Sequence, residues 1–237
     1  MRLRRRIYLM RHGAVDYFGA DGTPVPPHSV PLNATGRSQA DAAGELFARS
    51  DVRFDRVVAS GLPRTVETAE RVLAGAMQSN RLELEPALQE IRGGRLSDLA
   101  PGHIEDAFTA AFRAVGNVES QRFLGGESIG ELLDRVLPAF ERWLRDADWD
   151  CLLMVLHGGV NRALLARALT GGRAFFGRLE QAPACINVID VGTDHEIVRA
   201  INLAPSQWLH ERERLTTMEK LFLEYRRRGA GAVESAT

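Results

Sequence analysis

Short apolar runs alternate with segments of helical periodicity along most of the chain. The run at 151–156 is apolar throughout, which is typical of a central strand in a parallel sheet. Between the runs, apolar residues recur every three or four positions and predict helices over 33–49, capped by Asn33, over 64–77, and after residue 160. The runs that predict strands are residues 7–10, 56–59, 151–156, 186–191 and 196–201.

This alternation predicts βαβ units and therefore an α/β fold, a three-layer α/β/α sandwich with a mostly parallel central sheet. We expect a single domain over residues 1–237. The alternation stops between about 95 and 150, and this stretch is predicted to be a helical cap inserted over the sheet edge. Its strongest helical pattern runs from Ile129 to Leu144, and Pro138 is expected to kink that helix.

Two segments lie outside this scheme. Residues 16–31 hold four prolines and are predicted to form a long loop. Near the end of the chain, apolar residues at helical spacing predict an amphipathic helix over about 206–228. Its apolar face belongs either to the core or to a homodimer interface, and the sequence leaves both open. The Gly- and Ala-rich residues that follow are expected to be disordered.

Composition narrows the class of protein. The chain is 45% hydrophobic and 26% charged, as is ordinary for a soluble globular enzyme. Its net charge of −1 gives no basic footprint for nucleic acid. Cys151 and Cys185 lie inside apolar runs and are expected to be reduced thiols. The run at 7–10 is too short for a signal-peptide core, and no run reaches transmembrane length. We therefore expect a cytoplasmic protein that binds neither nucleic acid nor membrane.

Candidate chemistry follows two of the predicted strands. Arg11-His12-Gly13 comes directly after the first strand, and His157-Gly158 comes after the strand at 151–156 and opens a helix. Ligands of an open parallel sheet bind beyond the carboxyl ends of its strands. A helix N-terminus, with its free N–H groups, suits a phosphate. We therefore expect both histidines at one mouth of the sheet, although a pair of structural histidines is the alternative.

The strand at 56–59 contributes to the same edge. Ser60 ends it, and Arg64 stands at the start of the next helix. An arginine there can reach across the mouth, where its fork of N–H donors matches phosphate oxygens. The alternative is a solvated arginine at a helix start.

Together these motifs resemble the histidine phosphatase superfamily, which includes cofactor-dependent phosphoglycerate mutases. The resemblance spans roughly residues 6–169. The motifs, in order, are Arg11-His12-Gly13, then Leu32…Gly36…Gln39-Ala40, then Ser60…Arg64…Thr68-Ala69, then Glu90, then His157-Gly158-Gly159.

The resemblance implies roles for these residues. His12 would be the nucleophile that attacks phosphorus, with its ring neutral and its far nitrogen held by a backbone carbonyl. Arg11, Arg64 and His157 would surround the phosphoryl oxygens, with Gly158 at the helix start. Phosphoryl transfer needs mainly positioning and charge stabilisation, so such a pocket can replace magnesium. No metal or other cofactor is therefore expected.

Glu90 matches the family's proton donor. A leaving alkoxide needs a proton, and the same carboxylate could then activate the water that cleaves the phosphohistidine. The alternative is an exposed loop glutamate. Glu127 also lies in a segment that resembles the family, but Ser128 and Glu131 form a capping-box pattern there, which favours a structural role.

Departures from the family pattern guide the choice of activity. Many relatives carry an acidic residue and a Trp-Asn pair after Arg-His-Gly, whereas this chain has Ala14-Val15-Asp16-Tyr17-Phe18. Mutases rely on that region, so we favour a metal-independent phosphomonoester hydrolase that works through a phosphohistidine on His12. The alternatives are a phosphomutase of the same fold and a catalytically weak phosphate-binding or interaction module. The substrate would be a small phosphorylated metabolite, with a phosphoprotein left open.

Overall fold

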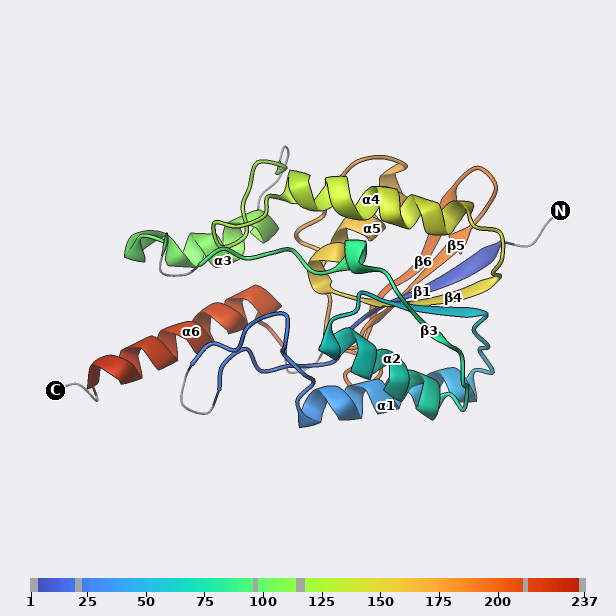
Figure 1. Ribbon diagram of the computed structural model, residues 1–237, viewed down its shortest axis with the longest axis horizontal. Coiled ribbons are helices and arrows are strands. Elements are labelled where there is room, and N and C mark those ends of the chain that lie inside the picture. Colours follow the sequence, from blue (N-terminus) through green and yellow to red (C-terminus); the bar gives the residue numbers. More distant parts are fainter. Residues whose placement is uncertain (1–3, 20–22, 96–97, 114–117, 211–212, 235–237) are drawn as a thin grey trace.

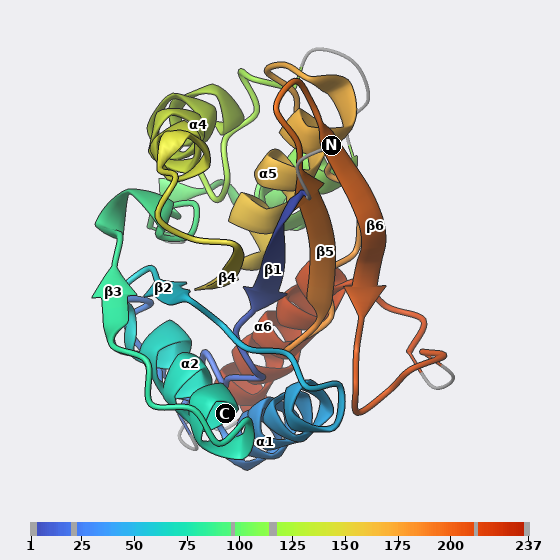
Figure 2. The same cartoon turned by 90° about the vertical axis from the view of Figure 1, so that its right-hand side faces the viewer.

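A six-stranded sheet forms the centre of the computed structural model, which describes residues 4–19, 23–95, 98–113, 118–210 and 213–234. The strand order is β3-β2-β4-β1-β5-β6, and helices cover both faces (Figures 1 and 2). β1, β2, β3 and β4 run parallel, whereas β5 is antiparallel to β1 and β6 to β5. The predicted α/β fold is thus confirmed. The strands are β1 (Arg5–Arg11), β2 (Arg56–Ala59), β3 (Leu82–Leu84), β4 (Cys151–Leu156), β5 (Ile186–Val191) and β6 (Glu196–Leu203).

The apolar strands occupy the middle of the sheet because both of their faces are covered. β4 pairs with β1 on one side and β2 on the other, and it is buried except at Cys151, which is half-buried. β3 was not predicted from the sequence, because it is only three residues long, lies at the edge of the sheet and has a glutamate at its centre. The antiparallel pair β5–β6 closes the other side with a tight turn from Gly192 to His195.

Two helices lie on each face of the sheet. α1 (Ala34–Arg49) and α2 (Pro63–Gly75) share one apolar cluster with Met10, Leu153 and Val155 of the sheet. α5 (Gly158–Thr170) packs on the opposite face. Asn33 caps α1 as predicted, because its side-chain oxygen accepts a hydrogen bond from Gly36 N at 2.8 Å.

The helix that the sequence analysis assigned to the cap belongs to the sandwich. α4 (Ile129–Arg145) packs beside α5, and its buried Leu133, Val136 and Phe140 join one apolar cluster with Ile7 and Leu9 of β1. Helical periodicity shows that one face of α4 is buried, but it cannot show which element covers that face. α4 also runs as one helix through Pro138 (Figure 1).

The cap is therefore smaller than predicted. Its helical elements are the short turn η3 (Pro101–His103) and the helix α3 (Ile104–Arg113), whereas the short turn η1 (Pro86–Leu88) comes before it and packs against α4. α3 lies beyond the sheet, next to α6 (Thr217–Glu234) (Figure 1).

α6 begins later than the predicted residue 206. Thr216 N and Oγ1 donate to the Glu219 carboxylate at 2.8 and 2.9 Å, and Glu219 N donates back to Thr216 Oγ1 at 3.2 Å. This reciprocal cap fixes the start of the helix at Thr217. The residues after 228 were predicted to be disordered, but α6 continues to Glu234, and 235–237 lie outside the described residues. Among the described helices, none is long and apolar enough to cross a membrane.

Candidate active site

A cavity of about 560 Å³ opens beyond the carboxyl ends of the parallel strands. Arg11, Arg64, Glu90 and Gly158 all line it. His12 and His157 directly follow β1 and β4; they are 1% and 0% exposed, and their ring centroids are 5.2 Å apart. The topology therefore gathers Arg11, Arg64, Glu90 and Gly158 around the cavity, while the two histidine rings are buried close together and are not among the residues that line it.

The backbone around His12 is held from several directions. His12 N donates to Leu156 O at 3.0 Å, which ties the end of β1 to β4. Gly13 N donates to Thr68 Oγ1 on α2 at 3.1 Å. A Cβ at Gly13 would lie 2.4 Å from Gly36 O, so only glycine permits this approach to α1. The motif glycines thus fix the loop that carries His12.

The His12 ring is neutral with a defined tautomer. Its Nδ1 lies 2.7 Å from Gly13 O, and because a carbonyl only accepts, Nδ1 carries the proton. Burial, followed by the charges of Arg64 and Arg11, holds the pKa of His12 well below its ordinary value. With the proton on Nδ1, Nε2 carries the lone pair of the ring, and among the described residues no hydrogen bond to Nε2 is found.

The protons around His157 can be assigned in the same way. Thr65 Oγ1 donates to Leu62 O at 2.8 Å, so Ser60 Oγ, 3.0 Å from Thr65 Oγ1, is the donor of that pair. Ser60 Oγ then accepts from His157 Nε2, which lies 2.7 Å away. This leaves a bare lone pair on Nδ1, which is buried without a partner. Burial and the charge of Arg64 lower the pKa of His157 well below its ordinary value.

Two buried guanidinium groups, those of Arg11 and Arg64, lie beside the two histidines, and we call these four residues the floor of the site. Arg11 and Arg64 are 6% and 2% exposed, and in each the Nε–H has no acceptor. Arg11 otherwise donates to Gln181 O and Thr217 Oγ1, and Arg64 donates to Pro27 O at 2.6 Å. Buried donors without acceptors are rare and costly, so these two N–H groups indicate the place of an anion. The Gly158 N–H, at the first position of α5, is a further donor with no acceptor in the helix.

The side chain of Glu90, which follows η1 in the sequence, lies against the N-terminus of α5. Both of its carboxylate oxygens lie 3.1 Å from Gly159 N, and Oε1 also accepts from Ile91 N at 3.0 Å. A Cβ at Gly159 would meet Oε1 at 2.6 Å, so glycine is needed there. Glu90 is therefore a half-buried cavity residue rather than an exposed loop glutamate, and it also caps α5.

Glu127 takes a structural place outside this cavity. Its carboxylate accepts from Arg135 at 2.9 and 3.1 Å and from Arg92 N at 2.9 Å. Ser128 and Glu131 form the capping box that their spacing predicted. Glu127 thus fixes the loop before α4.

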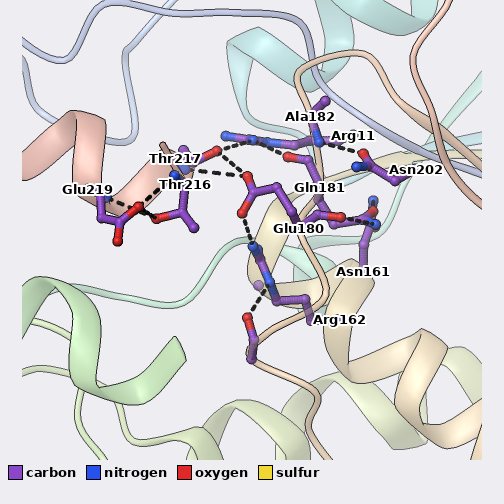
Figure 3. Close-up of polar contacts among 12 residues, drawn as sticks. Arg11, Asn161, Arg162, Glu180, Gln181, Ala182, Asn202, Thr216, Thr217 and Glu219 are labelled. Atoms are coloured by element: carbon purple, nitrogen blue, oxygen red, sulfur yellow. Dashed lines mark hydrogen bonds and ion pairs between the residues drawn. The ribbon is translucent and has the colours of Figure 1, made fainter. Parts of the chain in front are cut away.

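Sequence reasoning missed a chain of polar contacts that joins the floor to α6 (Figure 3). Arg162 of α5 is 4% exposed, lines the cavity and donates to Glu180 at 3.0 Å. Glu180 accepts from Thr217 Oγ1 at 2.8 Å, and Thr217 Oγ1 accepts from Arg11 at 2.9 Å. An arginine inside a helix that is buried on nearly all sides needs a partner, and that signal was available for Arg162. No comparable signal linked Thr217 to Arg11.

The two cysteines and possible metal-binding clusters were also considered as sources of catalytic groups. Burial raises the pKa of both Cys151 and Cys185 to about 12, so neither thiol is a nucleophile at neutral pH. Within the part of the chain that the structure describes, no cluster of three or more His, Cys, Asp or Glu residues could hold a metal ion.

Comparisons with known proteins agree with this geometry. The chain is 29% identical over 187 residues to a metal-independent phosphoserine phosphatase of Arabidopsis thaliana, covering 77% of this chain and 75% of the relative. It is 32% identical over 154 residues to a protein named probable phosphoglycerate mutase of Salmonella paratyphi A, covering 65% and 69%. The crystal structure of an α-ribazole phosphatase from Shigella flexneri superposes with a TM-score of 0.62 at 27% identity, covering 83% and 96%. The sequence model of the histidine phosphatase superfamily (branch 1) matches residues 7–204, and the chain therefore belongs to this family.

Proposed function

We propose that this protein is a metal-independent phosphomonoester hydrolase that transfers the phosphoryl group to His12. One observation carries the proposal. The neutral His12 ring has its proton on Nδ1, bonded to Gly13 O, and leaves Nε2 unpartnered beside Arg11 and Arg64, whose Nε–H groups lack acceptors. That is the arrangement a nucleophile and its phosphate site require.

In the first step, Nε2 of His12 attacks phosphorus in line. The Nε2–P bond forms as the P–O ester bond breaks, and the leaving oxygen takes a proton from Glu90. Arg11, Arg64 and the Gly158 N–H stabilise the charge on the equatorial oxygens. His157 Nδ1 can take the proton that a monoprotonated phosphate ester carries, and the resulting N–H then donates to a phosphoryl oxygen.

In the second step, water attacks the phosphohistidine. Glu90, now ionised, accepts a proton from the water as the new P–O bond forms and the N–P bond breaks. Inorganic phosphate leaves, and the neutral His12 ring is regenerated. In a mutase, a substrate hydroxyl would take the phosphoryl group in place of water.

The comparisons support the reaction class and leave this choice to experiment. The relatives include both a phosphatase and a protein named a mutase, so the fate of the phosphoenzyme separates the two activities. We favour hydrolysis because the cavity walls are mostly apolar, and the carboxylate of a phosphoglycerate would lose hydration against them. The free thiols of Cys151 and Cys185 support a reducing, cytoplasmic location.

The proposal is tested by turnover of p-nitrophenyl phosphate by pure protein in excess chelator. We expect turnover to survive, with inorganic phosphate as product and no transfer to phosphoglycerates. Loss of activity that an added divalent ion restores would overturn the metal-independent mechanism. Absence of turnover under all conditions would favour a phosphate-binding module.

A further inference from the structure

The walls of the cavity differ from its floor. Beyond the polar groups described above, aromatic and aliphatic side chains dominate the lining. Apart from Leu62 and Ile91, they come from four separate segments. These are the loop after β1, α3, the segment before α4, and α6. The side chains that matter most here are Phe18, Phe108, Phe112, Phe123, Met218 and Leu221.

These walls pack against one another. Phe112 contacts Phe123 edge to face, with ring centroids 5.8 Å apart. Phe108 of α3 lies 5.9 Å from Phe222 and 5.8 Å from Tyr225 of α6. α3 and α6 therefore stabilise each other, and the apolar walls are formed before any substrate binds.

α6 is also tied to the phosphate floor. Thr217, its first residue, accepts from Arg11 and donates to Glu180 (Figure 3). α6 lies outside residues 7–204, the region that the family model matches. A segment beyond the matched domain thus supplies part of the wall and holds it in register with the phosphate site.

Few positive charges remain for a second anionic group. Arg162 is committed to Glu180 and to Gly177 O, and its guanidinium lies 5.2 Å from the centre of the Phe112 ring. Apart from Arg11, Arg64 and Arg162, the cationic or potentially cationic lining groups are Arg92 and His28, both exposed; the other titratable ones are Tyr17 and Glu90. A carboxylate or second phosphate on the leaving group would therefore lose hydration against apolar walls.

We infer that the substrate is a phosphate monoester whose leaving group carries a bulky apolar body, such as an aromatic ring system or a long alkyl chain, and that α6 helps to select it. This inference rests on the proposed function, because it takes the floor as the phosphate site. The cavity volume falls within the range of about 300–1,000 Å³ that encloses drug-sized ligands, so it exceeds what a phosphate alone needs.

The test is the affinity of n-alkylphosphonates, from methyl to octyl, measured by titration calorimetry on the wild-type protein. Phosphonates are not hydrolysed, so binding is read without turnover. Each methylene that is fully buried should tighten binding roughly fourfold. A terminal carboxylate on a chain of matched length should weaken it at least about tenfold. Affinity that does not depend on chain length, or a preference for the carboxylate, would overturn the inference.

A pair of variants on α6 tests its share. Leu221→Ser removes an apolar side chain from the wall and should reduce the gain in affinity per methylene. Leu223→Ser makes the same change on α6 at a residue that does not line the cavity, and it should keep the wild-type gain. An equal effect of both variants would contradict a role for α6 in selection, and the wild-type series decides the substrate class even if Leu221→Ser does not fold.

The two proposals fail in different ways. Turnover through His12 with no dependence on chain length would refute only the substrate class. A clear dependence of phosphonate affinity on chain length in a protein without turnover would refute only the hydrolase.

Discussion

Replacing Gly36 by alanine should damage the site through the backbone that carries His12. A Cβ at position 36 would lie 2.1 Å from Ala14 O, whereas ordinary contact begins at 3.4 Å. The first turn of α1 and the loop after His12 must therefore separate by about 3.4 − 2.1 = 1.3 Å. Both partners are backbone, so no side chain can rotate to relieve the clash.

That separation opposes bonds that now hold the loop to α1. Ala14 N donates to Gln39 Oε1 at 2.9 Å, and Asn33 N donates to Ala14 O at 3.1 Å. Moving Gly13 O also turns the His12 ring, because that carbonyl holds Nδ1. A misplacement of about 1 Å can cost about 100-fold in rate, and overpacking typically costs about 1–3 kcal/mol of stability.

The assay is the single-turnover rate of phosphoenzyme formation from p-nitrophenyl phosphate, with thermal unfolding measured in parallel. We expect the rate to fall about 100-fold and the melting temperature to fall by about 2–4 °C per kcal/mol lost. Gly102→Ala is the matched control, because a Cβ at that position meets nothing within 4 Å. A Gly36→Ala variant that phosphorylates at the wild-type rate would refute the reasoning.

Three further predictions concern the buried polar groups. Ser60→Ala leaves His157 Nε2–H without an acceptor and should cost about 1–3 kcal/mol of stability and slow phosphorylation, whereas the exposed Ser38→Ala should do neither. Equal melting temperatures for all three proteins would contradict a stabilising hydrogen bond between Ser60 and His157. The lowered pKa values of His12 and His157 mean that below pH about 6.5 the unfolded chain takes up protons that the folded chain does not. The free energy of unfolding from urea titrations should then fall between pH 7.5 and 5.5, by up to about 1.4 kcal/mol per pH unit for each histidine, and a flat profile would refute this. Glu90→Gln should slow phosphorylation by an alkyl phosphate about 10²–10⁴-fold and by p-nitrophenyl phosphate far less, since nitrophenolate leaves without a proton; equal losses would restrict Glu90 to capping α5.

The strands were predictable because they are apolar runs buried on both faces. The bounds predicted for β2, β4 and β5 are those observed. β3 was missed because three residues around Glu83 carry no periodic signal. α4 was assigned to the cap because a helical pattern does not identify its partner. The start of α6 was also missed, although the Thr216–Glu219 capping pattern was in the sequence.

The floor of the site was predictable for a topological reason. Parallel strands place their carboxyl ends at one edge, so residues that follow those strands must meet there. The contacts of Thr217 with Arg11 and Glu180 were not predictable, because they depend on how segments far apart in the sequence approach one another. The same holds for the order of donors through Thr65, Ser60 and His157, which needs distances to assign each proton.

The central claim is tested most directly by locating the phosphoryl group on the enzyme. The protein is mixed with p-nitrophenyl phosphate, quenched in base, in which a phosphohistidine survives, and digested for tandem mass spectrometry. The account predicts phosphate on His12, its absence in His12→Ala, and its continued, slower formation on His12 in His157→Gln. Phosphate on His157, or a His12→Ala protein that is still phosphorylated, would contradict it.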